Sequence, residues 1–236
     1  MLIVCGPSCI GKDTFVKELE KFGWWKVMSY TTRPKRAGET TSDYIFVNDV
    51  EWEHMEDHNP FFETTHYLQE DGKIWSYGTT ISQWEDMAKH PKSVIILNPA
   101  GIYYLIQTAY LLNPPLKKED LNILYLTTDG SDEMNKELEK RYLERGGDEK
   151  KWFTRRTQDI EDFAKFDNNI RDGKVACNAL YTYRISETTP VERIECLAAM
   201  IDAIGVKPLV DAKEWREKHP EYYISLGMTK GYPCSD

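Results

Sequence analysis

The sequence predicts an α/β fold built on a five-stranded parallel sheet flanked by helices. Two observations lead to this prediction. Short apolar runs alternate for the most part with long helical patterns, an order typical of parallel sheets covered on both faces. The first of these runs ends at a glycine-rich loop that leads into an amphipathic helical pattern, as in many sheets that bind ligands at the carboxyl ends of their strands. The expected strands are 2–5, 24–29, 93–97, 122–126 and 182–186.

The expected helices have recognisable ends. Residues 189–192 read Thr-Pro-Val-Glu, a capping box with proline at the first helical position, and predict a helix that ends before Gly205. A second helical pattern covers about 132–145 and ends at Gly146 and Gly147, after which another helix begins. These patterns supply helices between the fourth and fifth strands and after the fifth.

A different pattern fills residues 33–80. Short alternating runs at 44–47 and 61–69 replace the long helices, and Asp71-Gly72 is typical of a hairpin turn. We interpret this segment as a small inserted β-rich domain. The pattern weakens again after residue 205, and the sequence assigns no role to 206–236.

Composition and charge exclude several classes of protein. The chain has 236 residues, which fits one large domain or a domain with a smaller insert. Its net charge of -9 disfavours a binder of duplex nucleic acid. The five cysteines include no CxxC pair, which indicates reduced thiols. Because no apolar run approaches the ~20 residues that a bilayer span requires, we expect a cytoplasmic protein without a membrane segment.

The glycine-rich loop nearly matches the P-loop pattern G-x-x-x-x-G-K-[ST]. In that pattern, backbone N–H groups at a helix N-terminus cradle phosphates and the lysine reaches the β and γ oxygens. The match lies between an apolar strand and an amphipathic helix, which is the context this chemistry needs. It predicts a P-loop NTPase-type fold that binds a nucleoside triphosphate or a ligand of similar shape. The expected triphosphate-binding residues are Gly6, Pro7, Ser8, Cys9, Ile10, Gly11, Lys12, Asp13 and Thr14, with Lys12 also catalytic.

A second motif carries a family resemblance. Residues 29–39 read Ser-Tyr-Thr-Thr-Arg-Pro-Lys-Arg-Ala-Gly-Glu and are followed by Asp43-Tyr44. This run closely resembles the S-x-T-T-R-x-x-R-x-G-E and D-Y motif of guanylate kinases, which phosphorylate GMP to GDP with ATP and Mg²⁺. The resemblance covers residues 1–204 and continues through 61–63, 77–79, 141–146 and Arg156.

The resemblance implies roles for the matching residues. Those that would hold the GMP phosphate are Arg33, Arg36, Tyr44 and Tyr77. Guanidinium forks and phenol donors suit a phosphate dianion. Those that would read guanine are Ser29, Glu63 and Thr79. A carboxylate accepts from the N1–H and exocyclic amine of guanine, whereas adenine has an acceptor at N1. The lid arginines that would stabilise the transferring phosphoryl group are Arg141, Arg145 and Arg156.

Two departures from the family pattern concern the metal. Asp13 stands where the P-loop pattern has a hydroxyl, and Ile96 and Asn98 stand where the family usually has two carboxylates. We hypothesise that Asp13 binds Mg²⁺ directly or through water, with Thr14 near the phosphates and Asn98 holding a water. The alternative is that Asp13 only favours the first turn of its helix, where an acid suits the helix dipole.

The sequence thus predicts a core domain at 1–32, 81–130 and 161–205, a GMP-binding insert at 33–80, a lid at 131–160 and an extension at 206–236. The expected activity is transfer of the γ-phosphoryl group of ATP to GMP or dGMP with Mg²⁺. The expected protein is a monomer or homodimer with no nucleic-acid or membrane partner. One alternative is a kinase of the same fold for another nucleotide or a sugar phosphate. A second is a non-catalytic guanylate-kinase-like protein-binding module, although Lys12 and the lid arginines argue against it.

Overall fold

The computed structural model describes residues 1–36, 39, 44–58, 60–69, 72–108, 115, 117–186, 189 and 191–204. The expected extension at 206–236 lies outside the described residues, as do Asp43 and Asp71 of the expected motifs. No helix in these described ranges combines the length and the apolar character that crossing a membrane requires.

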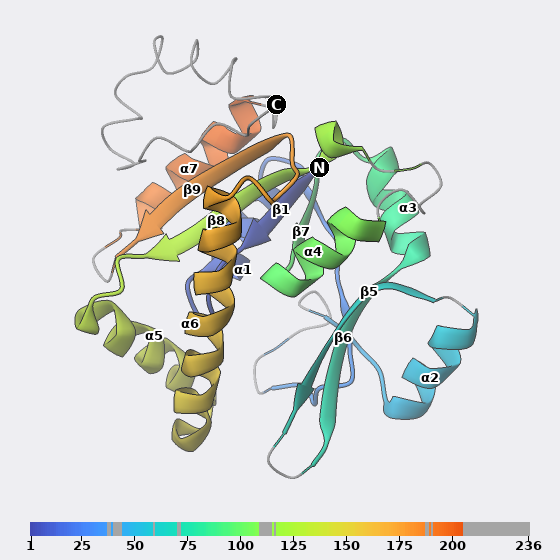
Figure 1. The fold of residues 1–236 in the computed structure, drawn as a ribbon, viewed down its shortest axis with the longest axis horizontal. Coiled ribbons are helices and arrows are strands. Elements are labelled where there is room, and N and C mark those ends of the chain that lie inside the picture. The colour runs from blue at the N-terminus through green and yellow to red at the C-terminus, as the bar shows by residue number, and fades with distance from the viewer. Residues whose placement is uncertain are drawn as a thin grey trace.

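A parallel five-stranded sheet forms the core, in the order β2-β7-β1-β8-β9 (Figure 1). Its strands are β1 (Leu2–Cys5), β2 (Trp25–Lys26), β7 (Ser93–Ile96), β8 (Asn122–Thr128) and β9 (Ala179–Ile185). All four neighbouring pairs are parallel, so the predicted sheet is confirmed. The second strand ends earlier than expected because the chain leaves the core there and enters a second sheet at Tyr30.

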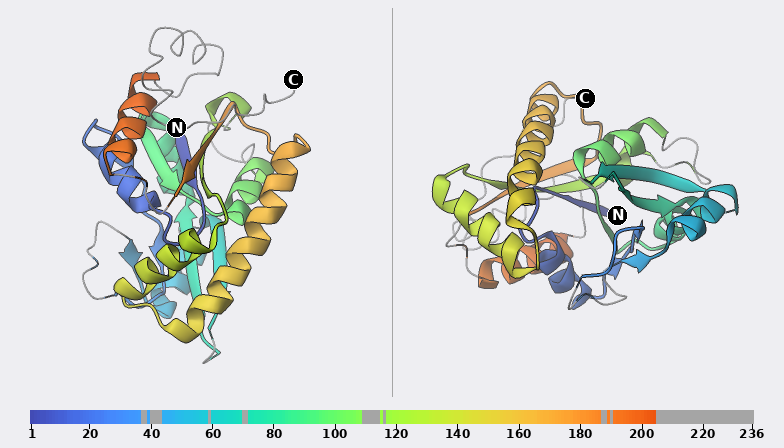
Figure 2. Two further views of the ribbon diagram at one scale, coloured as in Figure 1. Left: turned by 90° about the vertical axis from the view of Figure 1, so that its left-hand side faces the viewer. Right: turned by 90° about the horizontal axis from the view of Figure 1, so that it is seen from below.

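Helices cover both faces of the core sheet (Figures 1 and 2). The helices are α1 (Lys12–Glu20), α3 (Ile81–Lys89), α4 (Pro99–Thr108), α5 (Asp132–Glu144), α6 (Glu149–Arg171) and α7 (Val191–Ile204), with a short 3₁₀ helix at Lys118–Asp120. Alternate residues of β1 enter two different apolar clusters. Leu2 and Val4 pack with residues of α1 and α7, whereas Ile3 and Cys5 pack with residues of α4 and α6. The strand that leads into the P-loop is therefore buried on both faces.

The insert forms a separate four-stranded sheet in the order β4-β3-β6-β5. Its elements are β3 (Tyr30–Thr31), β4 (Ile45–Phe46), α2 (Asp49–His58), β5 (Phe61–Leu68) and β6 (Ile74–Thr80). The predicted hairpin is confirmed, because β5 pairs with β6 antiparallel and Gly72 adopts a positive φ of 80° in the turn. Helix α2 is an addition to the prediction. Only its Trp52 is buried, stacked on Phe61 at 3.9 Å, so its sequence shows no apolar stripe.

Helix α5 and the beginning of α6 lie at one end of the core, and α6 then runs along the side of the sheet (Figures 1 and 2). Helix α5 begins at Ser131, whose side chain accepts from the Met134 N–H, and ends before Gly146, which has a positive φ of 76°. Helix α6 continues without a break past residue 160, the expected lid boundary. It continues because Phe163 and Phe166 are buried in the apolar core. The expected lid and the core therefore share one continuous helix.

Candidate active site

The P-loop connects β1 to α1 at the carboxyl end of the central strand. Gly6 is required by close approach, because a Cβ there would lie 2.5 Å from the Leu126 carbonyl oxygen. Gly11 precedes α1 with a φ of 109°. The Lys12 Nζ donates to the carbonyl oxygens of Gly6 and Pro7, each at 2.8 Å, and burial lowers the pKa of this amine. The lysine is thus folded over the loop that would cradle phosphates.

Cys9 lies in this loop with a φ of 61°, the single non-glycine residue with positive φ among the described residues. An L-residue in this region carries strain of about 1 kcal/mol or more. Burial raises the pKa of the Cys9 thiol, and the nearby charges of Arg145 and Lys12 oppose that rise. Cys9 is therefore a strained filler of the loop, and Arg145 is close enough to act on it electrostatically.

Helix α6 contacts the P-loop through two charged residues. The backbone N–H of Ser8 donates to Oδ2 of Asp159 at 2.8 Å, and Nε of Arg155 donates to the Ser8 hydroxyl at 2.6 Å. The Arg155 guanidinium also lies 4.8 Å from the centre of the Tyr67 ring on β5. Neither residue of α6 was predicted. The one sequence signal for them is their i, i+4 spacing, which usually marks an exposed ion pair.

The three predicted lid arginines lie apart from these contacts. Arg141 donates to Glu137 at 2.8 Å on the same helix, and Arg145 is exposed at the end of α5. Arg156 donates to the Asn135 side chain of α5 at 3.1 and 2.6 Å. The structure therefore directs Arg156 toward α5, and its neighbour in sequence is the arginine of α6 that contacts the P-loop.

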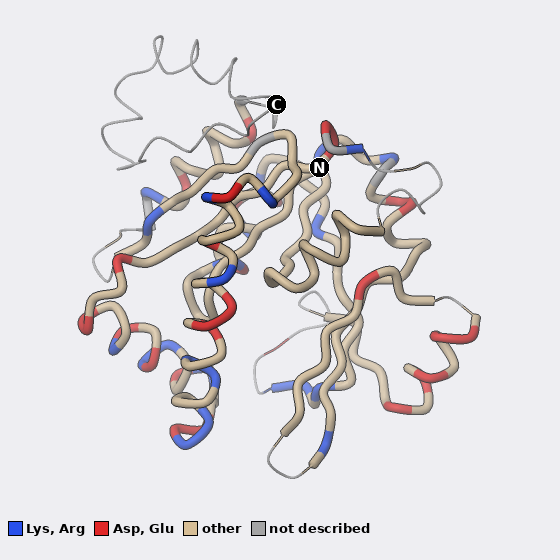
Figure 3. Tube along the Cα trace, viewed as in Figure 1, with Lys and Arg blue, Asp and Glu red and all other residues tan. Residues whose placement is uncertain are grey.

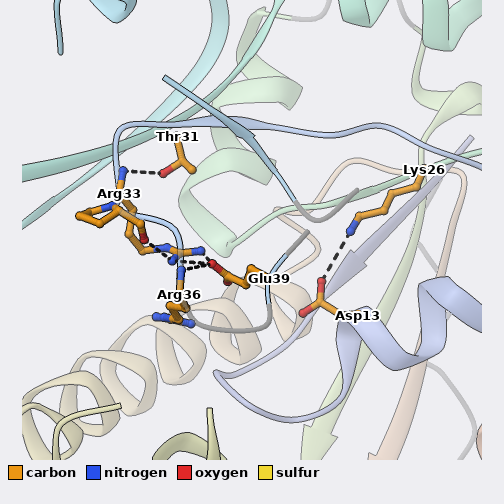
Figure 4. Close-up of polar contacts among 7 residues, drawn as sticks. Asp13, Lys26, Thr31, Arg33, Arg36 and Glu39 are labelled. Atoms are coloured by element: carbon orange, nitrogen blue, oxygen red, sulfur yellow. Dashed lines mark hydrogen bonds and ion pairs between the residues drawn. The ribbon is translucent and has the colours of Figure 1, made fainter. Parts of the chain in front are cut away.

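Contacts link the residues expected to hold the acceptor phosphate. Arg33 is buried and donates to both carboxylate oxygens of Glu39, at 2.9 and 2.7 Å (Figure 4). Its guanidinium lies 5.5 Å from the Tyr44 ring, which contacts the Tyr77 ring at 5.8 Å. The Arg36 side chain is exposed, and its backbone N–H donates to Glu39 at 2.8 Å. Burial raises the pKa of both phenols, so they remain neutral donors at neutral pH.

The residues expected to read the base also converge. The Ser29 and Thr79 hydroxyl oxygens lie 3.3 Å apart, and Glu63 is opposite Thr79 in the β5–β6 ladder. Residues directly opposite in a ladder share one face of the sheet. Glu63 is buried and accepts from the Thr65 hydroxyl at 3.2 Å, and burial raises its pKa to about 7. A Cβ at Gly101 would lie 2.9 Å from Oε1 of Glu63, so glycine leaves the room that this carboxyl group needs.

The three residues hypothesised to bind Mg²⁺ differ in their surroundings. Both polar atoms of Asn98 have protein partners, since its Oδ1 accepts from the Gly101 N–H at 2.8 Å and its Nδ2 donates to the Tyr67 hydroxyl at 3.0 Å. Thr14 is exposed. Asp13 has a partly exposed carboxylate, 3.8 Å from Nζ of Lys26 (Figure 4). The described residues contain no group of three or more His, Cys, Asp or Glu side chains that could hold a metal. Of the three, only Asp13 offers a charged oxygen beside the P-loop.

Charge is distributed unevenly over the fold. Many basic positions, with acidic ones among them, lie where α5 ends and α6 begins, whereas the charged residues of the outer helix α2 are acidic (Figure 3). A polyanionic ligand can therefore meet local positive charge near the expected lid although the whole chain is acidic.

Comparisons with known proteins agree on one family. A family model described as Guanylate kinase matches residues 1–110. The chain is 30% identical over 159 residues to a guanylate kinase of Prochlorococcus marinus subsp. pastoris, an alignment covering 66% of this chain and 77% of that protein. It is 41% identical over 66 residues to a guanylate kinase of Thermobifida fusca, covering 27% of this chain and 34% of that protein.

The extent of the matches varies. An alignment with a guanylate kinase from another strain of Prochlorococcus marinus, 33% identical, covers 41% of this chain and 51% of the relative. The chain thus spans about a third to a half of the first relatives it matches. The crystal structure of guanylate kinase from Anaplasma phagocytophilum superposes with a TM-score of 0.54 at 16% identity, over 92% of this chain and 93% of the other. That likeness shows a shared fold.

Proposed function

The chain belongs to the guanylate kinase family, and on that premise we propose that it transfers the γ-phosphoryl group of ATP to GMP or dGMP, giving ADP and GDP or dGDP. The observation that carries this proposal is the convergence of Ser29, Glu63 and Thr79 on one side of the insert. A buried carboxylate beside two hydroxyls can accept the N1–H and amine protons of guanine. Adenine would leave these buried groups unpaired, which is costly.

The donor side of the reaction uses the P-loop and the lid. We propose that Lys12 exchanges its contacts with the loop carbonyls for the β and γ oxygens of ATP. Arg145 and Arg141 are proposed to approach the same phosphates when the lid closes, with Gly146 and Gly147 as hinges. Arg155 already lies at the P-loop, and it is the arginine of α6 best placed to stabilise the transferring phosphoryl group.

The acceptor side is proposed to work by exchange of ion pairs. Arg33 is bound by Glu39 in this structure, and a phosphate dianion would take one or both of those donor positions. Tyr44 and Tyr77 contribute neutral hydroxyl donors beside it. No general base is needed because the attacking atom is an anionic phosphate oxygen. The chemistry then depends on positioning and on neutralising charge between the two substrates.

We propose that Mg²⁺ bound with ATP supplies further neutralisation of phosphate charge during transfer. Asp13 fits this ion, because Mg²⁺ keeps several waters and needs only one or two protein carboxylates. To bind Mg²⁺, the Asp13 carboxylate would move away from the Lys26 amine. Asn98 fits the role less well, since both of its polar atoms already have protein partners.

The domain roles remain part of the proposal. The core with its P-loop binds ATP, and α5 with the first half of α6 forms the lid. The insert binds the acceptor, and it begins at β3, before the expected boundary at 33, because Tyr30 and Thr31 already belong to its sheet. We further propose a cytoplasmic enzyme, in line with the unoxidised thiols of Cys5, Cys9 and Cys196.

A coupled assay of ADP release tests the proposal. Purified protein with ATP and Mg²⁺ would be offered GMP, dGMP, AMP, CMP, UMP and a sugar phosphate in turn. Turnover with GMP or dGMP supports the assignment. Turnover with another acceptor would reassign the substrate, and no turnover by folded protein would favour the protein-binding module.

A further inference from the structure

Asp159 is an acidic residue buried in an unusual place. It lies in the middle of α6 with 6% of its surface exposed, and its Oδ2 accepts from the Ser8 N–H of the P-loop at 2.8 Å. A buried carboxylate is strongly unfavourable unless it is paired and hydrogen-bonded. It also adds negative charge beside a loop that binds polyphosphate. Its presence therefore calls for a compensating role.

Asp159 forms an ion pair with Arg155. The Arg155 Nε lies 3.7 Å from Oδ1 of Asp159 one helical turn away, and it donates to the Ser8 hydroxyl at 2.6 Å. These contacts join the side chain to the P-loop. Rotation about the Arg155 side-chain bonds would break at least one of them.

The opposite side of Arg155 contacts the acceptor-binding insert. Its guanidinium lies 4.8 Å from the centre of the Tyr67 ring, and the Tyr67 hydroxyl accepts from Nδ2 of Asn98 at 3.0 Å. The Tyr67 ring also lies 5.6 Å from the ring of Tyr77. A continuous series of contacts thus runs from the end of β7 through the β5–β6 hairpin to the arginine and on to the P-loop.

We propose that Asp159 is a positioning residue that fixes Arg155 between the ATP and acceptor sites before the substrates bind. A free arginine side chain loses rotamer entropy when it is ordered, and a charge that is already in place need not lose it during the reaction. Tyr67 supports the same orientation from the other side. The inference rests on the proposed phosphoryl transfer for its catalytic consequence, but the ordering of Arg155 itself does not.

The charge of Asp159 gives the kinetic effect a distinctive form. Because the carboxylate repels the triphosphate, its removal is not expected to weaken ATP binding. Asp159→Ala should therefore lower kcat by about 10-fold to 100-fold and change KM for ATP by less than about threefold. The kcat of Asp159→Asn should lie between those of the wild-type protein and Asp159→Ala, since the asparagine can still accept from the Ser8 N–H but no longer forms an ion pair with Arg155. The Asn variant also serves if the Ala variant does not fold.

A double-mutant cycle separates positioning from a direct role. In an Arg155→Ala background, Asp159→Ala should cost less than about threefold in kcat, because the residue it positions is gone. Glu161→Ala is the matched control, since it removes an exposed acid from the same helix. An equal loss of kcat in both backgrounds, an unchanged kcat in the single variant, or a large rise in KM would overturn the proposal.

A spectroscopic readout keeps this inference distinct from the proposed function. The Arg155 Nε–H, assigned by its loss in Arg155→Lys, should give a resolved and slowly exchanging NMR resonance in the substrate-free protein. That resonance should disappear in Asp159→Ala and persist in Glu161→Ala. Its persistence in Asp159→Ala would overturn the positioning role. Failure of the wild-type protein to phosphorylate GMP would instead overturn the proposed function and leave this test in place.

Discussion

The burial of Glu63 predicts how the free energy of unfolding changes with pH. The carboxyl group is 7% exposed, and burial raises its pKa from 4.5 to about 7. The folded protein thus binds this proton more tightly than the unfolded chain does. The stabilisation is fully present below about pH 4.5 and is lost as the pH rises through about 7. Glu63→Gln removes the titrating group and keeps a side chain of similar size.

The size of the effect follows from the two pKa values. One pKa unit corresponds to about 1.4 kcal/mol, so the stability difference between wild type and Glu63→Gln should change by about 3 kcal/mol between about pH 4.5 and pH 8.5. The direction is fixed. Relative to the variant, the wild-type protein should lose free energy of unfolding as the pH rises.

Urea unfolding of substrate-free protein at several pH values measures this difference. Glu53→Gln, which alters an exposed carboxylate on α2, sets the baseline. Parallel stability curves for wild type and Glu63→Gln across this range would contradict this prediction. They would mean that the Glu63 carboxyl group is solvated and that the proposed base-reading site is not buried.

Three further predictions concern the P-loop and the lid. Cys9→Val should lower the free energy of unfolding by about 1–2 kcal/mol more than Cys9→Gly, because a β-branched residue tolerates a positive φ worst, and equal urea midpoints would contradict this. Arg155→Ala should lower kcat by about 100-fold or more, and Arg156→Ala should lower it by less than about tenfold, because only Arg155 contacts the P-loop. A larger loss of kcat in Arg156→Ala than in Arg155→Ala, measured in a steady-state assay, would contradict this prediction. Asp13→Ala should raise the Mg²⁺ concentration needed for half-maximal rate by about tenfold. An unchanged Mg²⁺ dependence would mean that Asp13 only stabilises the first turn of α1.

The parts of the site that could be predicted are those written in contiguous motifs. The P-loop needs glycines and a lysine at fixed spacing, and the insert motif fixes Arg33 and Tyr44 in the same way. Glu63 and Thr79 lie far apart in the sequence, yet the hairpin turn between them sets the strand register that places them opposite each other. Local rules were sufficient in these cases.

The arginines of the proposed lid could not be assigned from local sequence patterns. Arg155 and Arg156 are adjacent, and successive helical residues point about 100° apart, so choosing between them requires knowing how α6 is rotated against its neighbours. That rotation is set by Trp152, Phe163 and Phe166, which are buried in the core. Asp159 and Tyr67 belong to no motif at all. Their contacts arise only when α6 and the β5–β6 hairpin are brought together around the P-loop.

We propose that this chain phosphorylates a guanine nucleotide selected by Glu63. Measurement of kcat/KM for GMP and for AMP, with ATP as donor, in wild type and Glu63→Gln tests this selection. We expect a preference for GMP of at least about 100-fold in the wild-type protein and a clear loss of that preference in the variant. Equal kcat/KM for the two acceptors in the wild-type protein, or a preference that Glu63→Gln leaves intact, would contradict it.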